Sequence, residues 1–281
     1  MCFQNSPRQS MSVRNLLQSN SSTIEHQEGL CRWRTMVRFE SVAYDTATIK
    51  NASGSYHLFQ EERLINERPV NRDNPEKQVV EWLVSHLIVR NLFFSTLGFR
   101  QVNTPLLWIP RKSFEKAPIH DGDFDLLCYQ PDRFEELTSI EFKVIKVEEE
   151  SPEGYCRING LGKIDKLINQ GNTARRTGFR RTFVATVALL NLSNIPHQNV
   201  FTKTSRAEGY SAVYDIRNFG TLDSEVGYIL IELVQTTGKD WRKSGQMNMG
   251  TLKPPSAQIQ HWKTTRDFKD IYFRQAIKIA H

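Results

Sequence analysis

Apolar residues recur at the spacing of an amphipathic helix from Pro75 onward. The stretch PEKQVVEWLVSHLIVRNLFF, residues 75–94, has a proline in its first turn and follows Asp73 and Asn74, either of which can cap a helix. At about 100° per residue, one stripe of this helix collects Val80, Leu83, Leu87 and Phe94. Glu76 falls on the centre line of that stripe. Its carboxylate therefore either reaches solvent past the end of the core or points into a cleft at the rim of a sheet.

Shorter apolar runs in the rest of the chain predict several strands and two further helices. Strands are expected at FDLLCY (124–129), TSIEFKVIKV (138–147), TFVATVALLNL (182–192) and GYILIELVQTTG (227–238), in residues 101–111, and around Val37, Phe39 and Val42. Helices are expected at residues 161–175 and 266–280. The run TFVATVALLNL is nearly continuous in apolar residues, which is typical of a central strand covered on both faces.

The order of these elements predicts an α/β protein built on a mixed β-sheet with helices packed against it. Strands 124–129 and 138–147 are joined by a short polar turn and are expected to form a hairpin. Residues 1–35 are rich in Ser, Asn and Gln, which indicates a flexible N-terminal arm. Residues 36–281 are expected to form a single domain, with its core at about 75–192 and a basic C-terminal extension.

The distribution of charge along the chain indicates more about the binding partner than the overall composition does. The 281 residues are 39% hydrophobic and 24% charged, as in ordinary globular proteins, and the formal net charge is +6. Residues 160–185 carry +5 and residues 239–281 carry +6, so the remainder is acidic at −5. Basic segments beside an acidic part favour an anionic partner such as nucleic acid. A solvated surface that happens to be basic has the same composition.

Cysteine spacing and hydropathy exclude several classes of protein. The four cysteines Cys2, Cys31, Cys128 and Cys156 form no Cys-x-x-Cys pair, so neither a disulfide framework nor a zinc site is expected. The longest apolar run, from Phe183 to Leu192, is too short to cross a membrane, and the N-terminus lacks the apolar segment of a secretory signal. We therefore expect a cytoplasmic protein without a membrane partner.

Candidate chemistry lies on the predicted hairpin. Side chains alternate along TSIEFKVIKV, so Glu141 and Lys143 share one face while Ile140 and Phe142 share the other. Fifteen residues separate Asp125 from Glu141, a spacing that lets the two carboxylates meet across the hairpin. Converging carboxylates are costly to desolvate, and Mg²⁺, which prefers oxygen ligands, would offset that cost. Mn²⁺ is the expected substitute.

Each acidic residue near the hairpin has a candidate role. Asp125 and Glu141 would hold the metal, and Glu76 would complete its coordination shell or bind a second ion. The metal would bind a water molecule, and Lys143 would orient this water or help to deprotonate it. Asp123 is a rival for the position of Asp125, because it lies two residues away on the same face. The alternative interpretation is an exposed hairpin that carries an ordinary Glu–Lys pair.

This order of residues resembles the PD-(D/E)XK nuclease superfamily, whose core is the restriction-endonuclease-like fold. Asp125 matches the aspartate of the motif, Glu141 and Lys143 match the acid and the lysine of its E-x-K element, and Glu76 matches a helix glutamate found in many members. The resemblance covers roughly residues 75–192. It implies a restriction-endonuclease-like mixed sheet flanked by helices, with Asp125, Glu141 and Lys143 as catalytic residues.

A further match lies on the helix after the hairpin. Gln170, with Lys163 seven residues earlier, resembles the glutamine of the RecB-like branch and would be a fourth catalytic residue. The tyrosine that often follows this glutamine is absent, since Ala174 stands four positions on, and the branch stays open. The resemblance implies a metal-dependent nuclease that hydrolyses phosphodiester bonds in DNA rather than RNA, in defence against foreign DNA or in repair.

Basic residues beside this helix would contact the substrate. The expected phosphate-binding residues are Lys163, Arg175, Arg176, Arg180 and Arg181. Contacts of this kind give affinity with little sequence information. The aromatic residues Trp241, Trp262 and Tyr272 lie among the C-terminal bases, where they could stack on unpaired nucleobases.

Other functional classes stay open beside the nuclease. One is a relative of the same fold that binds nucleic acid or a protein without cleaving, and another is an interaction module in which the hairpin is incidental. A homodimer and a subunit of a larger complex are both compatible with the sequence. Ser139 has no histidine at a recognisable spacing and the chain has no G-x-x-x-x-G-K loop, so neither a serine triad nor ATP use is indicated.

Overall fold

The structure is a computed structural model of the chain. It describes residues 39–50, 57–58, 74–99, 105–117, 122–130, 132–149, 156–191, 210–235 and 240–279. The expected N-terminal arm at residues 1–35 lies outside these ranges.

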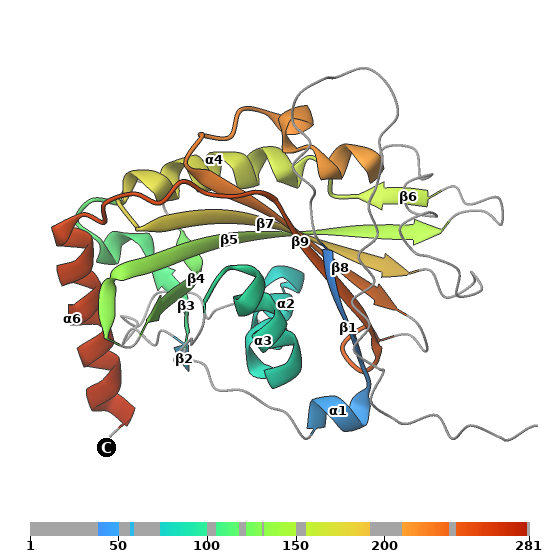
Figure 1. Ribbon diagram of the computed structural model, residues 1–281, viewed down its shortest axis with the longest axis horizontal. Coiled ribbons are helices and arrows are strands. Elements are labelled where there is room, and N and C mark those ends of the chain that lie inside the picture. Colours follow the sequence, from blue (N-terminus) through green and yellow to red (C-terminus); the bar gives the residue numbers. More distant parts are fainter. Residues whose placement is uncertain are drawn as a thin grey trace, which may run out of the picture.

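A single mixed sheet of nine strands organises the described chain (Figure 1). The strands are β1 (Phe39–Tyr44), β2 (His57–Leu58), β3 (Leu106–Pro110), β4 (Asp123–Gln130), β5 (Arg133–Glu149), β6 (Cys156–Asn159), β7 (Arg181–Asn191), β8 (Val226–Gln235) and β9 (Gly245–Lys253). Their order is β1-β9-β8-β7-β5-β4-β3-β2, and β6 pairs with the far end of β5. The neighbours β5–β7 and β7–β8 run parallel, as do β2 and β3, and the other pairs are antiparallel. The α/β class with a mixed sheet is confirmed.

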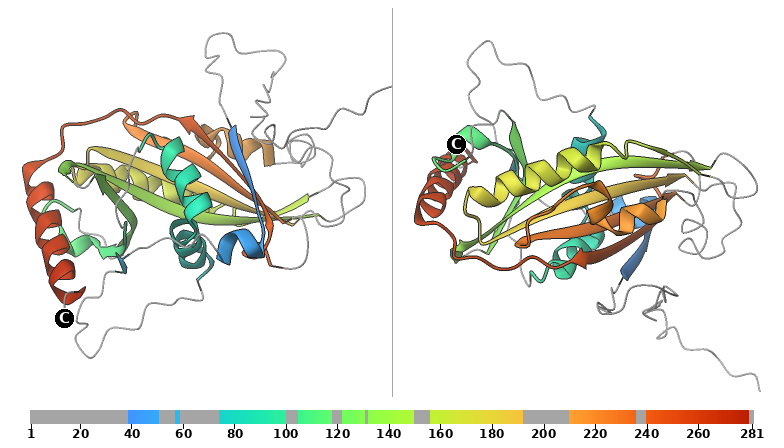
Figure 2. Two further views of the ribbon diagram at one scale, coloured as in Figure 1. Left: turned by 60° about the horizontal axis from the view of Figure 1, so that its bottom comes forward. Right: turned by 90° about the horizontal axis from the view of Figure 1, so that it is seen from above.

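Helices cover both faces of this sheet (Figure 2). The α-helices are α1 (Thr46–Lys50), α2 (Pro75–Ser85), α3 (Leu87–Thr96), α4 (Lys163–Arg176) and α6 (Trp262–Ile279), and short 3₁₀ helices are η2 (Arg111–Ser113), η3 (Tyr210–Tyr214) and η4 (Ile216–Phe219). One apolar core lies between the sheet and α2 and α3, and a second lies under α4, η3 and η4. A third joins α6 to β3, β4 and the start of β5.

Strand β5 contributes to all three cores, because its side chains alternate between the two faces of the sheet and Leu137, near its start, lies in the third core. Ile140, Phe142 and Val144 pack toward α2 and α3, whereas Ile145 and Val147 pack toward α4. All five side chains are buried. The long strand therefore fixes the position of the residues between them, which include Glu141 and Lys143.

The helix predicted at residues 75–94 is two helices. His86 interrupts it with an extended backbone (φ −106°, ψ 111°), and α3 begins at the next residue. The break turns the following residues relative to α2, so Leu87, expected on the buried stripe, is 45% exposed. Pro75 stands at the start of α2 and Asn74 caps it by accepting the Glu76 N–H, as predicted.

Most of the other sequence-based elements are present with small shifts. The strands predicted at residues 124–129, 138–147, 182–192 and 227–238 correspond to β4, β5, β7 and β8, and the helix 161–175 corresponds to α4. The C-terminal helix begins at Trp262, earlier than expected. Strand β9 was not predicted because its sequence, GQMNMGTLK, has little apolar alternation, although β1 and β8 pair with it on both sides.

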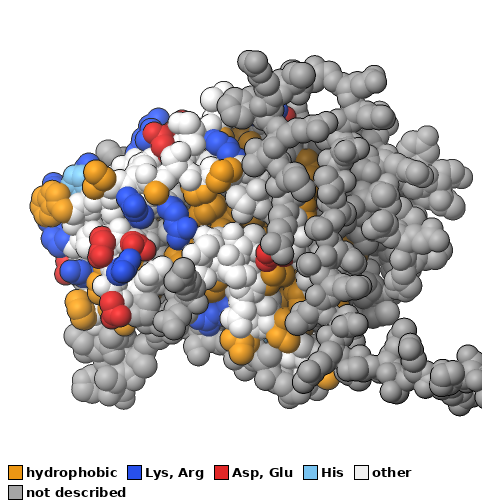
Figure 3. Space-filling model, in the orientation of Figure 1, with side chains coloured by type: hydrophobic (Ala, Val, Ile, Leu, Met, Phe, Trp, Pro, Cys, Tyr) orange, Lys and Arg blue, Asp and Glu red, His pale blue; other side chains and the backbone are white. Residues whose placement is uncertain are grey.

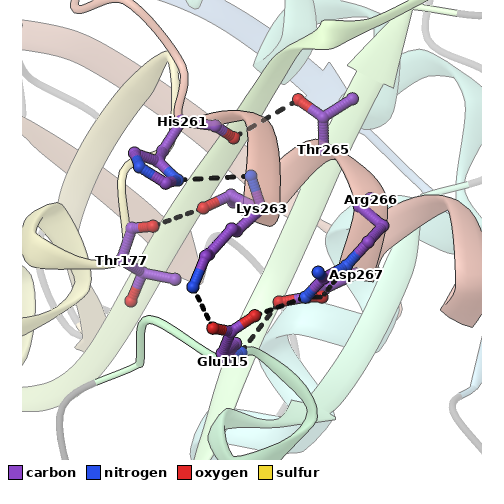
Figure 4. A network of polar contacts seen from close by, with 8 residues as sticks. Glu115, Thr177, His261, Lys263, Thr265, Arg266 and Asp267 are labelled. Carbon is purple, nitrogen blue, oxygen red and sulfur yellow. Dashed lines mark hydrogen bonds and ion pairs between the residues drawn. The ribbon is translucent and has the colours of Figure 1, made fainter.

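Polar contacts fasten α6 to the rest of the molecule (Figure 4). Asp267 accepts the Glu115 N–H at 2.8 Å, and the Thr264 hydroxyl donates to the Thr177 carbonyl. Lys263 and Arg266 both pair with the Glu115 carboxylate. The bases at the start of this helix are therefore already partnered by acids.

No helix within the described ranges has the length and apolar character that crossing a membrane would need.

Candidate carboxylate site

The candidate site lies where β4 and β5 separate. Their register pairs Leu126 with Ile140, which places Asp125 opposite Glu141 one residue further on. Strand β5 pairs with β6 again only from Lys146 onward. Within the described chain, residues 141–145 of β5 thus have no strand partner on this side, and we call this stretch the open edge.

Side chains form hydrogen bonds with the main-chain groups of the open edge. The Phe142 N–H, which would otherwise donate to a neighbouring strand, donates to Asp125 Oδ2 at 2.8 Å. The Phe142 carbonyl accepts from Lys143 Nζ at 2.9 Å, and the Val144 carbonyl accepts from Lys163 Nζ at 3.3 Å. Unpaired main-chain groups in a sheet are costly to bury, so these contacts stabilise the separation of the strands.

Glu141 is the most enclosed acid of the site. Its residue is 0% exposed, and Oε1 accepts from Arg111 NH2 at 2.8 Å. The other oxygen, Oε2, is buried without a hydrogen-bond partner among the described residues. Burial and, to a smaller extent, the Asp125 carboxylate raise the pKa of Glu141 to about 8, against the opposing effects of Arg111 and Lys143.

Asp125 shares this environment. Burial raises the pKa of Asp125, and the Lys143 charge and the hydrogen bond from the Phe142 N–H offset part of this rise. Two acids whose ionised forms are both disfavoured face one another here. A divalent cation between them would relieve their desolvation and their mutual repulsion.

Glu76 and Lys143 form the more accessible side of the site. Lys143 Nζ lies 2.9 Å from Glu76 Oε2, and their side chains are 11% and 17% exposed. Glu76 comes from the first turn of α2, so this contact joins the helix to β5. Of the two alternatives for Glu76, the inward one is correct.

The expected set of three acidic metal ligands is not assembled. No group of three or more His, Cys, Asp or Glu side chains is placed to hold a metal ion in the ranges that the structure covers. Glu76 pairs instead with the Lys143 ammonium. The expectation that Glu76 coordinates a metal together with Asp125 and Glu141 stays a prediction.

Two carboxylates remain, and their chemistry fits Mg²⁺. The ion commonly binds through one or two carboxylates and keeps several waters. Asp125 and Glu141 face each other, and Glu141 Oε2 is a buried oxygen with no partner among the described residues. These two residues would hold the ion.

The rival aspartate has a different position. Asp123 contacts Lys77 at 3.4 Å, and its side chain is 31% exposed. The strand register places Asp125, and not Asp123, opposite Glu141.

Gln170 lies on α4, above the strand pair that carries Glu141. A Cβ added to the neighbouring Gly171 would come within 2.3 Å of Val184, which is the register partner of Glu141 on β7. The helix therefore approaches the sheet closely at this turn. Gln170 Oε1 is buried and has no hydrogen-bond partner in the described part of the chain.

The expected phosphate-binding residues do not form one open basic surface. Arg175 pairs with Asp223 at 2.8 Å, Arg180 donates to the Gln258 carbonyl at 2.6 Å, and Arg181 donates to the Leu97 carbonyl at 2.8 Å. Lys163 is exposed but donates to the open edge. Arg176 is exposed on the last turn of α4. Arg175, Arg180 and Arg181 thus each have an internal acid or carbonyl as a partner, and the phosphate-binding role of the five residues stays a prediction.

The aromatic residues of the C-terminal segment separate in the same way. Trp241 packs edge-on against Trp82, and Tyr272 packs against Tyr129 in the third core. Trp262 alone of the three is largely exposed, at 61%. Figure 3 shows acidic and basic side chains interspersed at the α6 end of the molecule, so a surface of one charge is absent from the described part of this face.

Sequence reasoning missed Arg111 and Trp108. Arg111 follows the last residue of β3 and is only 3% exposed, with its guanidinium 4.5 Å above the Phe124 ring. Trp108 has a left-handed backbone (φ 56°), which is rare for a bulky residue. Its neighbours on β3 pair with the residues on either side of Asp125, so Trp108 stands opposite Asp125. Nothing in the spacing of either residue indicates the site. A proline followed by arginine at a strand end is the only signal, and it is a weak one.

Comparison with models of protein families, with curated proteins and with solved structures gives no match at the level required for significance.

Proposed function

We propose that this protein is a metal-dependent nuclease of the restriction-endonuclease-like fold that hydrolyses phosphodiester bonds in DNA. One observation carries the proposal: Asp125 and Glu141 face each other at a gap in the sheet, with Lys143 beside them. Buried carboxylates with raised pKa values are a frequent feature of functional sites. A role in defence against foreign DNA or in repair belongs to the same proposal.

Each residue of the site would have a separate role in hydrolysis. A divalent metal held by Asp125 and Glu141 would supply Lewis-acid stabilisation of the charge that develops on the scissile phosphate. Lys143 is fixed by Glu76 and by the Phe142 carbonyl, and its ammonium would orient the attacking water. Gln170 would contribute a buried acceptor from α4.

Cleavage of plasmid and of single-stranded DNA in Mg²⁺ or Mn²⁺ tests the proposal. We expect Asp125→Ala and Lys143→Ala to lower the rate by about 10²-fold or more. Asp123→Ala is the matched comparison, because it removes the rival carboxylate on the same strand and should retain cleavage. Equal cleavage by all four proteins would place the activity elsewhere, and a wild-type protein that cleaves neither substrate would reject the proposal.

A second candidate function is a binding module of the same fold that does not cleave. The open edge supports it, since Asp125, Lys143 and Lys163 all satisfy main-chain groups there, and the acids Glu76 and Glu141 already have cationic partners. Such contacts are what a purely structural role requires. A protein that binds DNA without cleaving it, and whose binding is the same in Asp125→Ala, would favour this candidate.

A further inference from the structure

Arg111 forms an ion pair with Glu141 at the carboxylate site, and each of the two side chains has a second buried atom without a described partner. Its NH2 donates to Glu141 Oε1 at 2.8 Å, whereas its NH1 is buried and has no partner among the described residues. The Glu141 carboxylate is similar, because Oε1 is bound by Arg111 while Oε2 has no hydrogen-bond partner in the described part of the chain. Among the residues that the structure describes, this ion pair therefore leaves one buried donor and one buried acceptor without a partner.

The Arg111 side chain is held in place from two directions. Its backbone N–H donates to the Gly122 carbonyl at 3.0 Å, just before β4, and its carbonyl accepts the Phe114 N–H at 3.0 Å. The guanidinium carbon lies 4.5 Å from the centre of the Phe124 ring, which restricts the plane of the group. A fixed, almost fully buried guanidinium is costly unless every donor finds an acceptor.

The two unpaired atoms call for ligands of opposite charge. Glu141 Oε2 needs a cation or a donor, and Arg111 NH1 needs an acceptor. A divalent cation with a phosphate oxygen beside it provides both at once. Guanidinium groups suit phosphate because their donors form a planar fork.

We propose, resting on the proposed function for the identity of the substrate, that Arg111 binds a non-bridging oxygen of the substrate phosphate through NH1 while NH2 stays on Glu141. Arg111 is then a substrate-binding residue as well as the counter-ion of Glu141. The rival role is neutralisation of Glu141 alone. A lysine at this position can replace the charge, but it cannot donate from two fixed nitrogens to two partners.

Binding of a fluorescent single-stranded oligonucleotide of about 12 nucleotides separates these roles. Anisotropy is measured in Ca²⁺, which takes the same oxygen ligands, and a gel verifies that the DNA stays intact. The proteins are wild type, Arg111→Lys, Arg111→Gln and Arg90→Lys. Arg90 is the matched control because it is a buried arginine stacked on the Phe94 ring, away from the carboxylates. A second oligonucleotide has an uncharged methylphosphonate backbone.

We expect both Arg111 variants to weaken binding of the phosphodiester oligonucleotide by about tenfold or more, because a hydrogen bond to a charged group is lost. Arg90→Lys should bind as wild type does. The methylphosphonate oligonucleotide should bind equally to all four proteins, since it lacks the charged oxygen.

Three results would overturn the inference. The first is wild-type affinity in Arg111→Lys, which assigns Arg111 to charge neutralisation and decides the question even if Arg111→Gln fails to fold. The second is an equal loss of affinity for both backbones, and the third is a wild-type protein that does not bind the phosphodiester oligonucleotide. Arg111-dependent binding by a protein that cleaves no DNA would reject the nuclease and leave this inference standing.

Discussion

Asp125 and Glu141 occupy opposite positions on β4 and β5, one residue beyond the last paired residues of the two strands, Leu126 and Ile140. The hairpin therefore brings two acids together at the point where its main-chain hydrogen bonds stop. This placement joins the chemistry of the site to the architecture of the sheet, and it gives the substitutions below distinct expected outcomes.

Removing the charge of Asp125 should stabilise the protein while it abolishes cleavage. Burial disfavours the ionised carboxylate, and an asparagine keeps an oxygen for the Phe142 N–H. We expect Asp125→Asn to raise the free energy of unfolding by up to about 1 kcal/mol, measured by urea denaturation in EDTA.

Asp215→Asn is the matched control for that substitution. Asp215 caps η4, and its hydrogen bonds from Arg217 lower its pKa, so its loss of charge should lower stability. A marked loss of stability in Asp125→Asn would identify Asp125 as a residue kept for folding alone.

Glu232 should make the stability of the protein depend on pH. It is fully buried on β8, accepts from Tyr210 and Tyr214 at 2.6 and 2.7 Å and from Asn248 at 3.2 Å, and burial raises its pKa. The folded state therefore binds the proton more tightly than the unfolded state does. The corresponding stability is fully present below the unfolded pKa and is lost as the pH rises through the folded pKa.

Urea midpoints across this pH range, in wild type and in Glu232→Gln, provide the measurement. The decline with rising pH should be shallower in the variant, because glutamine does not titrate. The same slope in both proteins would show that other groups cause it.

Gly171 should be required for the close approach of α4 to the sheet. An alanine there places its Cβ within 2.3 Å of Val184, and overpacking of this kind costs about 1–3 kcal/mol. Gly162→Ala is the control, because a Cβ at that position before the same helix meets open space. Urea denaturation should show the loss for Gly171→Ala alone, and equal stabilities would mean that α4 shifts freely.

Glu76 should act on the reaction through Lys143. Glu76→Gln removes the charge that holds the Lys143 ammonium at 2.9 Å, so kcat should fall by about tenfold to a hundredfold with little change in KM. Glu76→Asp, which retains the charge, should recover part of the rate. A fall in kcat/KM caused entirely by KM would instead indicate that Glu76 affects substrate binding.

The sequence predicted the hairpin and the meeting of Asp125 with Glu141, because strand alternation and turn position are local properties. The sequence could not predict where β4 separates from β5, because this point depends on the pairing of β4 with β3 and of β5 with β6. It could not predict Arg111 at the site either, because its contact with Glu141 spans 30 positions along the chain. Strand β9 and the break at His86 depend in the same way on neighbours distant in sequence.

The catalytic role of Asp125, Glu141, Lys143 and Gln170 stays a prediction, and so does the identity of the metal. What the fold adds is the connection between Glu76 and Lys143, and the assignment of Arg175, Arg180 and Arg181 to internal contacts. The partners of these arginines lie 48 to 84 positions away along the chain, so the sequence could not indicate their internal contacts.

The hydrogen bond from the Phe142 amide to Asp125 has a practical consequence. An amide proton bonded to a carboxylate changes its NMR chemical shift when that carboxylate takes up a proton or a cation. The backbone resonance of Phe142 therefore reports on the state of Asp125, and titration with Mg²⁺ can be followed at a single atom in the unmodified protein without substrate.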